Sequence, residues 1–283
     1  MSELDPTNRS AASPEPPADS PNLSARSLCV GYGSRRIITE LDTLIPPSSF
    51  TVILGPNGCG KSTLLRTFAR LLRPQSGAVL LNGDDLFTIP SRSVARTIGL
   101  LPQTSTAPEG ITVIDLVRRG RYPHRTLLKQ WSPEDETAVR QALVATRTLE
   151  FSQRRVDELS GGQRQRVWIA LVLAQQTPIV LLDEPTTYLD ISHQIELLEL
   201  CVALNAQGRT LVAVLHDINQ AARYATHIIA MRAGAILASG TTREVVTEAR
   251  IEEVFGVRSR IIDDPETGTP LVVPLAQDSL SPR

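Results

Sequence analysis

The chain has 283 residues, a formal net charge of −1 and a sequence pI near 6.4. This length can hold one large or two small domains, and the near-neutral charge gives no electrostatic argument for binding nucleic acid. The cysteines lack metal-ligand spacing and suit a reducing compartment. No apolar run approaches the roughly 20 residues of a membrane span, and the N-terminus has no signal-peptide pattern. We therefore expect a cytoplasmic protein that meets a membrane through a partner.

The first 24 residues are rich in proline, serine and acidic residues and contain almost nothing apolar. Such a composition cannot bury enough surface to offset the entropy of ordering, so we expect a disordered tail over residues 1–24. From Ala25 to Ile45, short apolar stretches are interrupted by Gly31-Tyr32-Gly33, which predicts antiparallel strands at one edge of the fold. Tyr32 is placed either to stack on a nucleobase or simply to half-bury itself in a strand.

A phosphate-binding loop follows in the stretch Leu54-Gly55-Pro56-Asn57-Gly58-Cys59-Gly60-Lys61-Ser62-Thr63. It satisfies the pattern G-x-x-x-x-G-K-[ST] and lies between an apolar strand, Thr51–Leu54, and a helix predicted over Thr63–Leu72. Glycines let backbone N–H groups turn towards an anion, and the helix N-terminus adds a favourable dipole. We expect Lys61 to bridge the β- and γ-phosphates of a nucleotide and Ser62 to hold Mg²⁺.

Lysine usage supports this interpretation. Of the 29 basic residues, only Lys61 and Lys129 are lysine. A chain that uses arginine almost everywhere keeps a lysine where the loop needs a compact point charge.

A second hairpin is predicted around Asn82-Gly83, and another strand over Thr97–Leu101. From about residue 104 to 164 helical signals replace strand signals, which predicts a helical insertion in an α/β domain. This segment contains a helix start at Ser132-Pro133 and a basic cluster that we interpret as a solvated face rather than a specific partner site. The cluster consists of Arg118, Arg119, Arg121, Tyr122, His124 and Arg125.

Two further features resemble parts of a phosphate site. Ser160-Gly161-Gly162-Gln163 precedes a helix, an arrangement of hydroxyl, free N–H groups and dipole that binds anions. The apolar strand Pro178–Leu182 then ends in Asp183-Glu184, at the edge where parallel sheets bind ligands. We expect Asp183 to serve the Mg²⁺ and Glu184 to polarise an attacking water.

The remainder continues the α/β pattern. An amphipathic helix is predicted with an apolar face of Ile191, Ile195, Leu198 and Val202, followed by a strand that ends in His216. A hairpin is predicted around Arg232-Ala233-Gly234, and a capping box at Thr241-Thr242-Arg243-Glu244. We expect residues 257–274 to be irregular and residues 277–283 to fray.

Together these motifs resemble the nucleotide-binding subunit of an ABC transporter over residues 25–240. The resemblance implies an α/β fold of the P-loop NTPase (RecA-like) type, with a mostly parallel core sheet, an antiparallel β edge subdomain and an inserted α-helical subdomain. It implies an ABC domain at 25–255, with the helical subdomain at about 104–164 and a partly irregular extension at 256–283. It also implies ATP and Mg²⁺ as ligands, and a second copy whose Leu159–Gln163 segment completes the phosphate site.

The resemblance assigns a role to further residues. Tyr32 is similar to the aromatic residue that stacks on adenine, and Gln103 to the glutamine that touches Mg²⁺ or water. Glu184 corresponds to the general base, Asp190 to a residue that communicates across the dimer, and His216 to the γ-phosphate switch. The nucleotide-binding set then comprises Tyr32, Gly55, Pro56, Asn57, Gly58, Cys59, Gly60, Lys61, Ser62, Thr63, Ser160, Gly161, Gly162, Gln163 and Asp190.

Three stretches resemble the branch of ATP-binding proteins that serves bacterial iron–siderophore importers, with vitamin B12 and haem importers as relatives. They are Gly120–His124, residues 183–194 and Asp264–Pro274. This implies a peripheral protein at the cytoplasmic face of the inner membrane, with permease subunits as partners and a substrate-binding protein as an indirect one. The alternative is a soluble ABC ATPase that acts as a nucleotide-gated clamp.

Overall fold

The structure, a computed structural model, describes residues 20–125, 131–187 and 189–276. Its core is a six-stranded sheet in the order β10-β9-β3-β8-β7-β6, in which only β10 runs antiparallel to its neighbour. All residues of β3, β7 and β8 are buried, as expected for strands covered on both faces. The strands are β3 (Phe50–Leu54), β6 (Ile98–Leu101), β7 (Ile179–Asp183), β8 (Thr210–Val214), β9 (His227–Arg232) and β10 (Ala235–Gly240).

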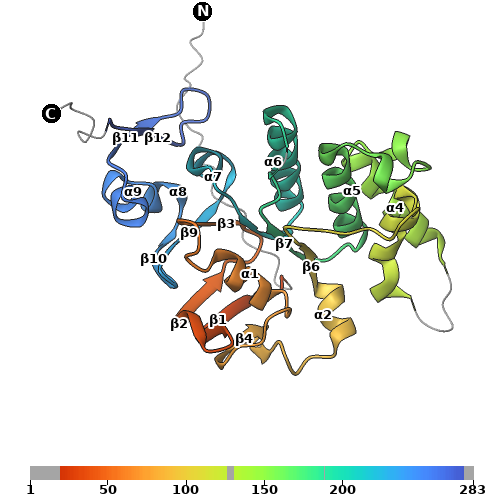
Figure 1. Cartoon of the computed structure of the whole chain (residues 1–283), viewed down its shortest axis with the longest axis horizontal. Coiled ribbons are helices and arrows are strands. Elements are labelled where there is room, and N and C mark those ends of the chain that lie inside the picture. Colours follow the sequence, from red (N-terminus) through yellow and green to blue (C-terminus); the bar gives the residue numbers. More distant parts are fainter. Residues whose placement is uncertain (1–19, 126–130, 188, 277–283) are drawn as a thin grey trace, which may run out of the picture.

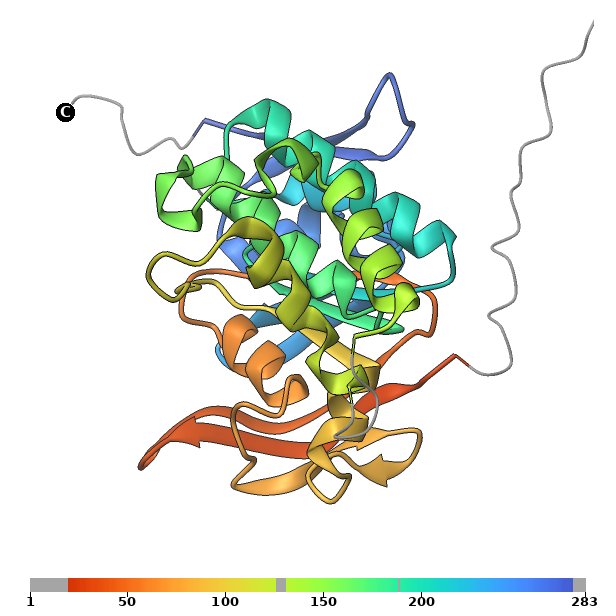
Figure 2. The ribbon, with the colours of Figure 1, turned by 90° about the vertical axis from the view of Figure 1, so that its right-hand side faces the viewer.

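A second, four-stranded antiparallel sheet has the order β2-β1-β4-β5 and forms a separate layer, on the side of the core away from the helices of the insertion (Figure 2). Its strands are β1 (Leu23–Tyr32), β2 (Arg35–Ile45), β4 (Ser76–Leu81) and β5 (Asp84–Asp85). Helix α1 (Lys61–Phe68) lies between the two sheets and buries Leu64, Leu65 and Phe68 there (Figure 1). This layer corresponds to the predicted antiparallel edge subdomain. Helix α2 (Ser91–Thr97) comes next along the chain, after β5.

Between β6 and β7 the chain is helical, as the sequence predicts. The elements are α3 (Val113–Arg118), the 3₁₀ turn η1 (Arg119–His124), α4 (Pro133–Ala145), the short turns η2 (Leu149–Phe151) and η3 (Val156–Glu158), and α5 (Gly161–Ala174). Helix α4 begins with the expected capping box, in which Ser132 and Asp135 bond each other's backbone N–H groups. The helices form a lobe beside the core sheet (Figure 1).

Part of the basic cluster in this lobe is buried, since Arg121 is only 5% exposed, whereas Arg119, Tyr122 and Arg125 are exposed as expected. Its Nε donates to Asp135 Oδ1 at 2.8 Å, and its Nη1 donates to Ala174 O at 2.8 Å and to Gln176 Oε1 at 2.9 Å. The Nε2 atom of His124 lies 2.8 Å from Gln175 O. The expectation was wrong for these two residues because the last carbonyls of α5 and the first turn of α4 offer acceptors that charge alone cannot reveal.

Helix α6 (Ile191–Ala206) buries a face that shares only Leu198 with the predicted one. Its buried residues are Leu197, Leu198, Cys201 and Leu204. Ile191 and Val202, which the sequence placed in the core, are 73% and 42% exposed. The helix is apolar on more than one side, so spacing alone could not choose the packed face.

The end of the described chain is more regular than expected. Helices α7 (Ile218–Tyr224), α8 (Thr242–Val245) and α9 (Glu248–Phe255) precede an antiparallel hairpin of β11 (Ser259–Asp263) and β12 (Pro270–Pro274). The Asn219 side chain fixes this hairpin by accepting from the Val272 N–H at 2.8 Å and donating to its carbonyl at 3.2 Å.

Two sequence expectations concern the ends of the chain. Strand β1 begins at Leu23, so the expected tail overlaps it by two residues, while residues 1–19 and 277–283 lie outside the described part. None of the helices in the described part is both long enough and apolar enough to cross a membrane.

The Arg121–Asp135 pair gives a stability prediction. Both side chains are less than 8% exposed, so Asp135→Ala leaves a buried guanidinium without its carboxylate. We expect a loss of about 3–5 kcal/mol in the free energy of unfolding, measured by urea denaturation. The exposed pair Arg118–Asp115 is the control, since Asp115→Ala should cost no more than about 1 kcal/mol. Equal losses in the two variants would contradict the assignment of Arg121 as a buried anchor.

Candidate functional site

The glycine loop between β3 and α1 has the backbone geometry of an anion cradle. Gly55, Gly58 and Gly60 all have positive φ angles, of 152°, 75° and 109°. A Cβ on Gly55 would lie 2.1 Å from the Met231 carbonyl oxygen, so the close approach of β9 requires glycine there. The buried Lys61 ammonium donates to the carbonyls of Gly55 at 2.8 Å and Pro56 at 3.0 Å.

The rest of the loop is held by its own backbone. Cys59 is 3% exposed, its N–H donates to Pro56 O at 3.4 Å, and burial raises the pKa of its thiol. Gly60 is the N-cap of α1, and Ser62 and Thr63 occupy its first turn. The loop therefore holds a cation on its inner side and presents a helix N-terminus, as phosphate binding requires.

A cleft of about 690 Å³ opens in front of this loop. This volume lies within the range of ligand sites. Its walls come from the β1–β2 hairpin, the glycine loop and the carboxyl ends of three core strands. The lining residues are Tyr32, Arg35, Ile37, Asn57, Gly58, Gly60, Lys61, Ser62, Thr63, Gln103, Glu184 and His216.

Asp183 lies at the end of β7 with a side chain that is 1% exposed. Burial raises the pKa of its carboxyl. The Ser62 hydroxyl and the Arg66 guanidinium, whose Nε lies 3.5 Å from Asp183 Oδ2, offset only part of this increase. Neither carboxylate oxygen has a hydrogen-bond partner among the described residues. The guanidinium of Arg66 is the counter-ion of this buried carboxylate, and the hydroxyl of Ser62 beside it makes an oxygen-ligand set suited to Mg²⁺.

Glu184 is the centre of a small polar cluster. Its Oε2 accepts from Gln103 Nε2 at 2.7 Å and lies 3.0 Å from His216 Nε2. Burial alone would raise the pKa of Glu184, but the hydrogen bond and charge of His216, together with the bond from Gln103, hold it below its usual value. β7 is paired with β6 on one side and with β8 on the other, all parallel, so the ends of the three strands bring these side chains together.

The Ser160–Gln163 segment and Asp190 lie outside this cleft. Ser160 and Gln163 form a capping box at the start of α5, with bonds of 3.3 and 3.1 Å. Asp190 caps α6 by accepting from the His193 N–H at 2.9 Å. Gly161 and Gly162, at the start of α5, do not line the cleft either, and Tyr188 lies outside the described residues. Within one chain, the predicted nucleotide-binding residues therefore fall into two groups, one in the glycine loop and the cleft in front of it, and one that lies outside the cleft at the starts of α5 and α6.

Sequence reasoning missed Arg35 and Ile37 in the wall of the cleft, and Arg66 beside Asp183. A signal for the first two was present in the hairpin, because a turn at Gly33-Ser34 pairs Tyr32 with Arg35. Residues paired in this way share a face of the sheet, and Ile37 follows on the same face.

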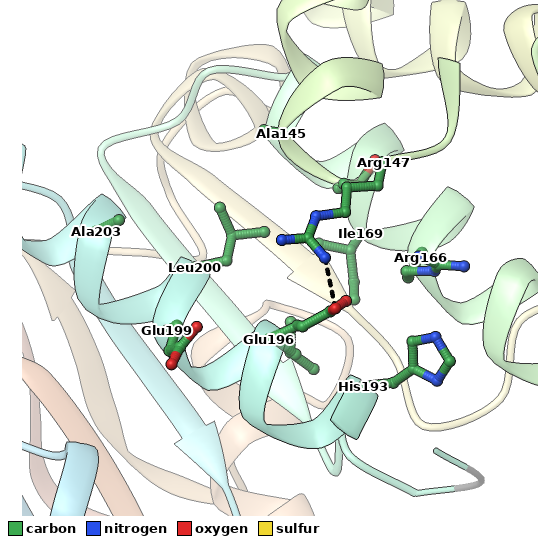
Figure 3. Close-up of a pocket in the computed structure, with 11 residues that line it drawn as sticks. Ala145, Arg147, Arg166, Ile169, His193, Glu196, Glu199, Leu200 and Ala203 are labelled. Atoms are coloured by element: carbon green, nitrogen blue, oxygen red, sulfur yellow. Dashed lines mark hydrogen bonds and ion pairs between the residues drawn. The ribbon is translucent and has the colours of Figure 1, made fainter. Parts of the chain in front are cut away.

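Another cavity, of about 230 Å³, lies where the helical lobe meets α6 (Figure 3). Arg147, after the end of α4, pairs across it with Glu196 of α6 at 2.5 Å. Of the predicted nucleotide residues, none lines it. The pair is largely exposed, so it contributes little to stability.

Comparisons with known proteins agree with this geometry. The family described as "ABC transporter" matches residues 38–187. The chain is 56% identical over 260 residues to the ferric enterobactin transport ATP-binding protein FepC of Escherichia coli K12, covering 92% of this chain and 96% of that protein. It is 52% identical over 253 residues to the probable siderophore transport system ATP-binding protein YusV of Bacillus subtilis 168, covering 89% and 92%.

Solved structures give the same fold. A structure described as an inward-facing ABC transporter of metal-chelate type matches with a TM-score of 0.78 and 28% identity, covering 92% of this chain and all of that one. A dimeric ATP-binding cassette with ADP and phosphate, in a post-hydrolysis state, matches with a TM-score of 0.69 and 27% identity, covering 77% and 98%. The predicted P-loop NTPase fold is confirmed.

The chain therefore belongs to the ABC transporter family. It is an ATP-binding subunit that hydrolyses ATP.

The contacts of Lys61 predict that its ammonium cannot be replaced. Lys61→Ala should leave ATP binding undetectable or very weak, because it removes the charge facing the phosphates. Lys61→Arg should fail almost as badly, since the two carbonyls around Nζ leave little room for a guanidinium. Equilibrium dialysis with labelled ATP measures both, with the exposed Arg140→Ala as a control. Near-normal binding by Lys61→Ala would refute the site.

Proposed function

We propose that this chain is the ATP-hydrolysing subunit of an importer that takes up ferric siderophores through a separate membrane permease. The observation that carries this proposal is the 56% identity to FepC over nearly the full length of both chains. A relative named for cobalamin import is only 38% identical, and the match covers 63% of that relative. Import of vitamin B12 therefore has less support than import of a siderophore.

Different residues of the cleft are suited to bind different parts of ATP. Tyr32, 49% exposed at the mouth of the cleft, is free to stack on adenine, and Lys61 in the same cleft would meet the β- and γ-phosphates. Ser62 and Asp183 would hold Mg²⁺, with Gln103 reaching the same region from the end of β6. When bound, the ion neutralises phosphate charge. The described residues contain no group of three or more His, Cys, Asp or Glu side chains that could hold a metal ion, so the nucleotide would supply further oxygen ligands.

Glu184 is the residue best placed to act as general base on the attacking water. Its lowered pKa keeps it ionised at neutral pH, in the form that accepts a proton. The His216 ring, next to Glu184, can orient that carboxylate and donate to the γ-phosphate. In the arrangement seen, Gln103 and His216 both occupy Glu184 Oε2, so this atom must give up at least one of these contacts to bind a water.

Two copies of the chain are needed to complete the site in this proposal. Ser160, Gly161, Gly162, Gln163 and Asp190 lie outside the cleft, yet they carry the hydroxyl, glycine N–H groups and helix N-terminus that bind phosphate. A head-to-tail dimer would bring this set onto the ATP of the partner. A matching solved structure is described as a dimeric ATP-binding cassette, which supports a dimer of this chain.

The location follows from the partners. We place the protein on the cytoplasmic face of the inner membrane, bound to permease subunits that receive the siderophore from a substrate-binding protein. Specificity for iron then belongs to those partners, because in this proposal the cleft is filled by ATP and its residues never meet the siderophore.

Glu184→Gln should keep the affinity for ATP and slow hydrolysis by about 10²-fold or more, the scale for losing a general base. Because only the chemical step is blocked, the variant should accumulate as a dimer with Mg·ATP in size-exclusion chromatography. The wild-type protein with Mg·ADP is the control and should elute as a smaller species. A strictly monomeric variant at saturating ATP would contradict the two-copy site.

Deleting the gene should abolish uptake of radioactive iron supplied as a siderophore complex. Labelled vitamin B12 and haem, measured in parallel, should enter at the normal rate. Restoring the wild-type gene should recover uptake, and restoring Glu184→Gln should not. Lost uptake of B12 or haem with normal iron uptake would assign the protein to a sister importer. Normal uptake of all three would refute the importer.

A further inference from the structure

Arg35 occupies a wall of the nucleotide cleft that the motifs do not explain. It is the first residue of β2 and the backbone partner of Tyr32 across the hairpin, so the two side chains share one face of the sheet. That face is turned to the cleft, since Tyr32, Arg35 and Ile37 all line it together with Lys61. Arg36, the next residue, belongs to the opposite face and is absent from the lining.

The backbone that carries Arg35 is held against the glycine loop. A Cβ on Gly60 would contact the Ile37 side chain at 3.3 Å, and a Cβ on Gly234 would lie 2.0 Å from the Ile37 carbonyl oxygen. The turn is also tied down by Gln75, whose Nε2 donates to Gly33 O at 3.1 Å. The Arg35 side chain therefore extends from a fixed backbone rather than from a free loop tip.

The charge of Arg35 has no counter-ion among the described residues. Neither an ion pair nor a side-chain hydrogen bond is made by its guanidinium in residues 20–125, 131–187 and 189–276. The other arginine close to the loop, Arg66, instead faces Asp183 at 3.5 Å. An uncompensated cation in the wall of an anion-binding cleft is available to the ligand itself.

Position along the cleft indicates which part of the ligand Arg35 meets. Lys61 and the glycine loop hold the β- and γ-phosphate end, and Tyr32 marks the nucleobase end. Arg35 is opposite Tyr32, so it stands at the nucleobase end, where the α-phosphate lies nearer than the γ-phosphate. A guanidinium binds phosphate oxygens through two parallel N–H donors.

We propose that Arg35 is a second nucleotide-binding cation, which contacts the α-phosphate of ATP and ADP alike and sets affinity rather than the rate of hydrolysis. This rests on the proposed nucleotide site, but it assigns a residue that lies outside the phosphate loop and the other motifs. It predicts that Arg35 helps to retain ADP after hydrolysis, because the α-phosphate remains in the product.

The test compares Arg35→Ala with Arg36→Ala, a neighbouring arginine on the other face of the same strand. Arg35→Ala should raise the Kd for Mg·ADP and the KM for ATP by about five- to tenfold, the scale of one exposed charge-assisted contact. The kcat at saturating ATP should stay within about twofold of the wild type, because no atom near the γ-phosphate changes. Arg35→Lys should recover part of the affinity, and Arg36→Ala should behave as the wild type.

Two further measurements identify the contact. The affinity difference between wild type and Arg35→Ala should shrink in 0.5 M salt, roughly three times the physiological ionic strength, because interactions between exposed charges are screened. The inhibition constant of adenosine, which has no phosphate, should be the same for both proteins. Equal Kd values for ADP in the Arg35 and Arg36 variants would overturn the proposal, as would a loss of adenosine binding. Failure of the wild type to bind ATP would instead overturn the nucleotide site.

Discussion

The site depends on one constraint, namely that the carboxyl ends of parallel strands meet at one edge of the core sheet. β3 delivers the glycine loop, β7 delivers Asp183 and Glu184, and β8 leads directly to His216. β3 and β7 both pair with β8, so residues about 120 positions apart in sequence reach the same cleft through backbone register. The close packing of Gly55 against the Met231 carbonyl then fixes the loop to β9 on the other side.

This arrangement shifts the pKa values of two neighbouring carboxyl groups in opposite directions. Asp183 points into the protein, where burial raises its pKa and leaves its oxygens without hydrogen bonds. Glu184 has a left-handed backbone, with a φ of 53°, and its carboxylate is stabilised by His216 and Gln103. Such a conformation is costly for a residue other than glycine and is concentrated at functional sites. The turn therefore separates a group suited to a cation from a group suited to accept a proton.

The sequence was sufficient to predict the parts that depend on local backbone chemistry. The glycine loop, the capping boxes at Ser132 and Thr241, and the buried strands all have short patterns with a direct physical meaning. The buried face of α6 was predicted wrongly because Ile191 and Leu197 are equally apolar, and only packing against α5 and the sheet distinguishes them. The burial of Arg121 was missed for a related reason, since its partners lie 14 and 53 residues away.

That burial has a consequence for the helix that follows the Leu159-Ser160-Gly161-Gly162-Gln163 segment. The N-terminus of α5 is closed by the Ser160–Gln163 box, and its last carbonyls are bound by Arg121 and His124 of η1. With 14 residues it spans about 21 Å, and both of its ends are held by side chains rather than left to fray. A stiff helix of this kind keeps a constant distance between η1 and Ser160. A displacement of η1 that keeps these bonds would therefore be passed along α5 to the residues that we propose to meet the partner's ATP.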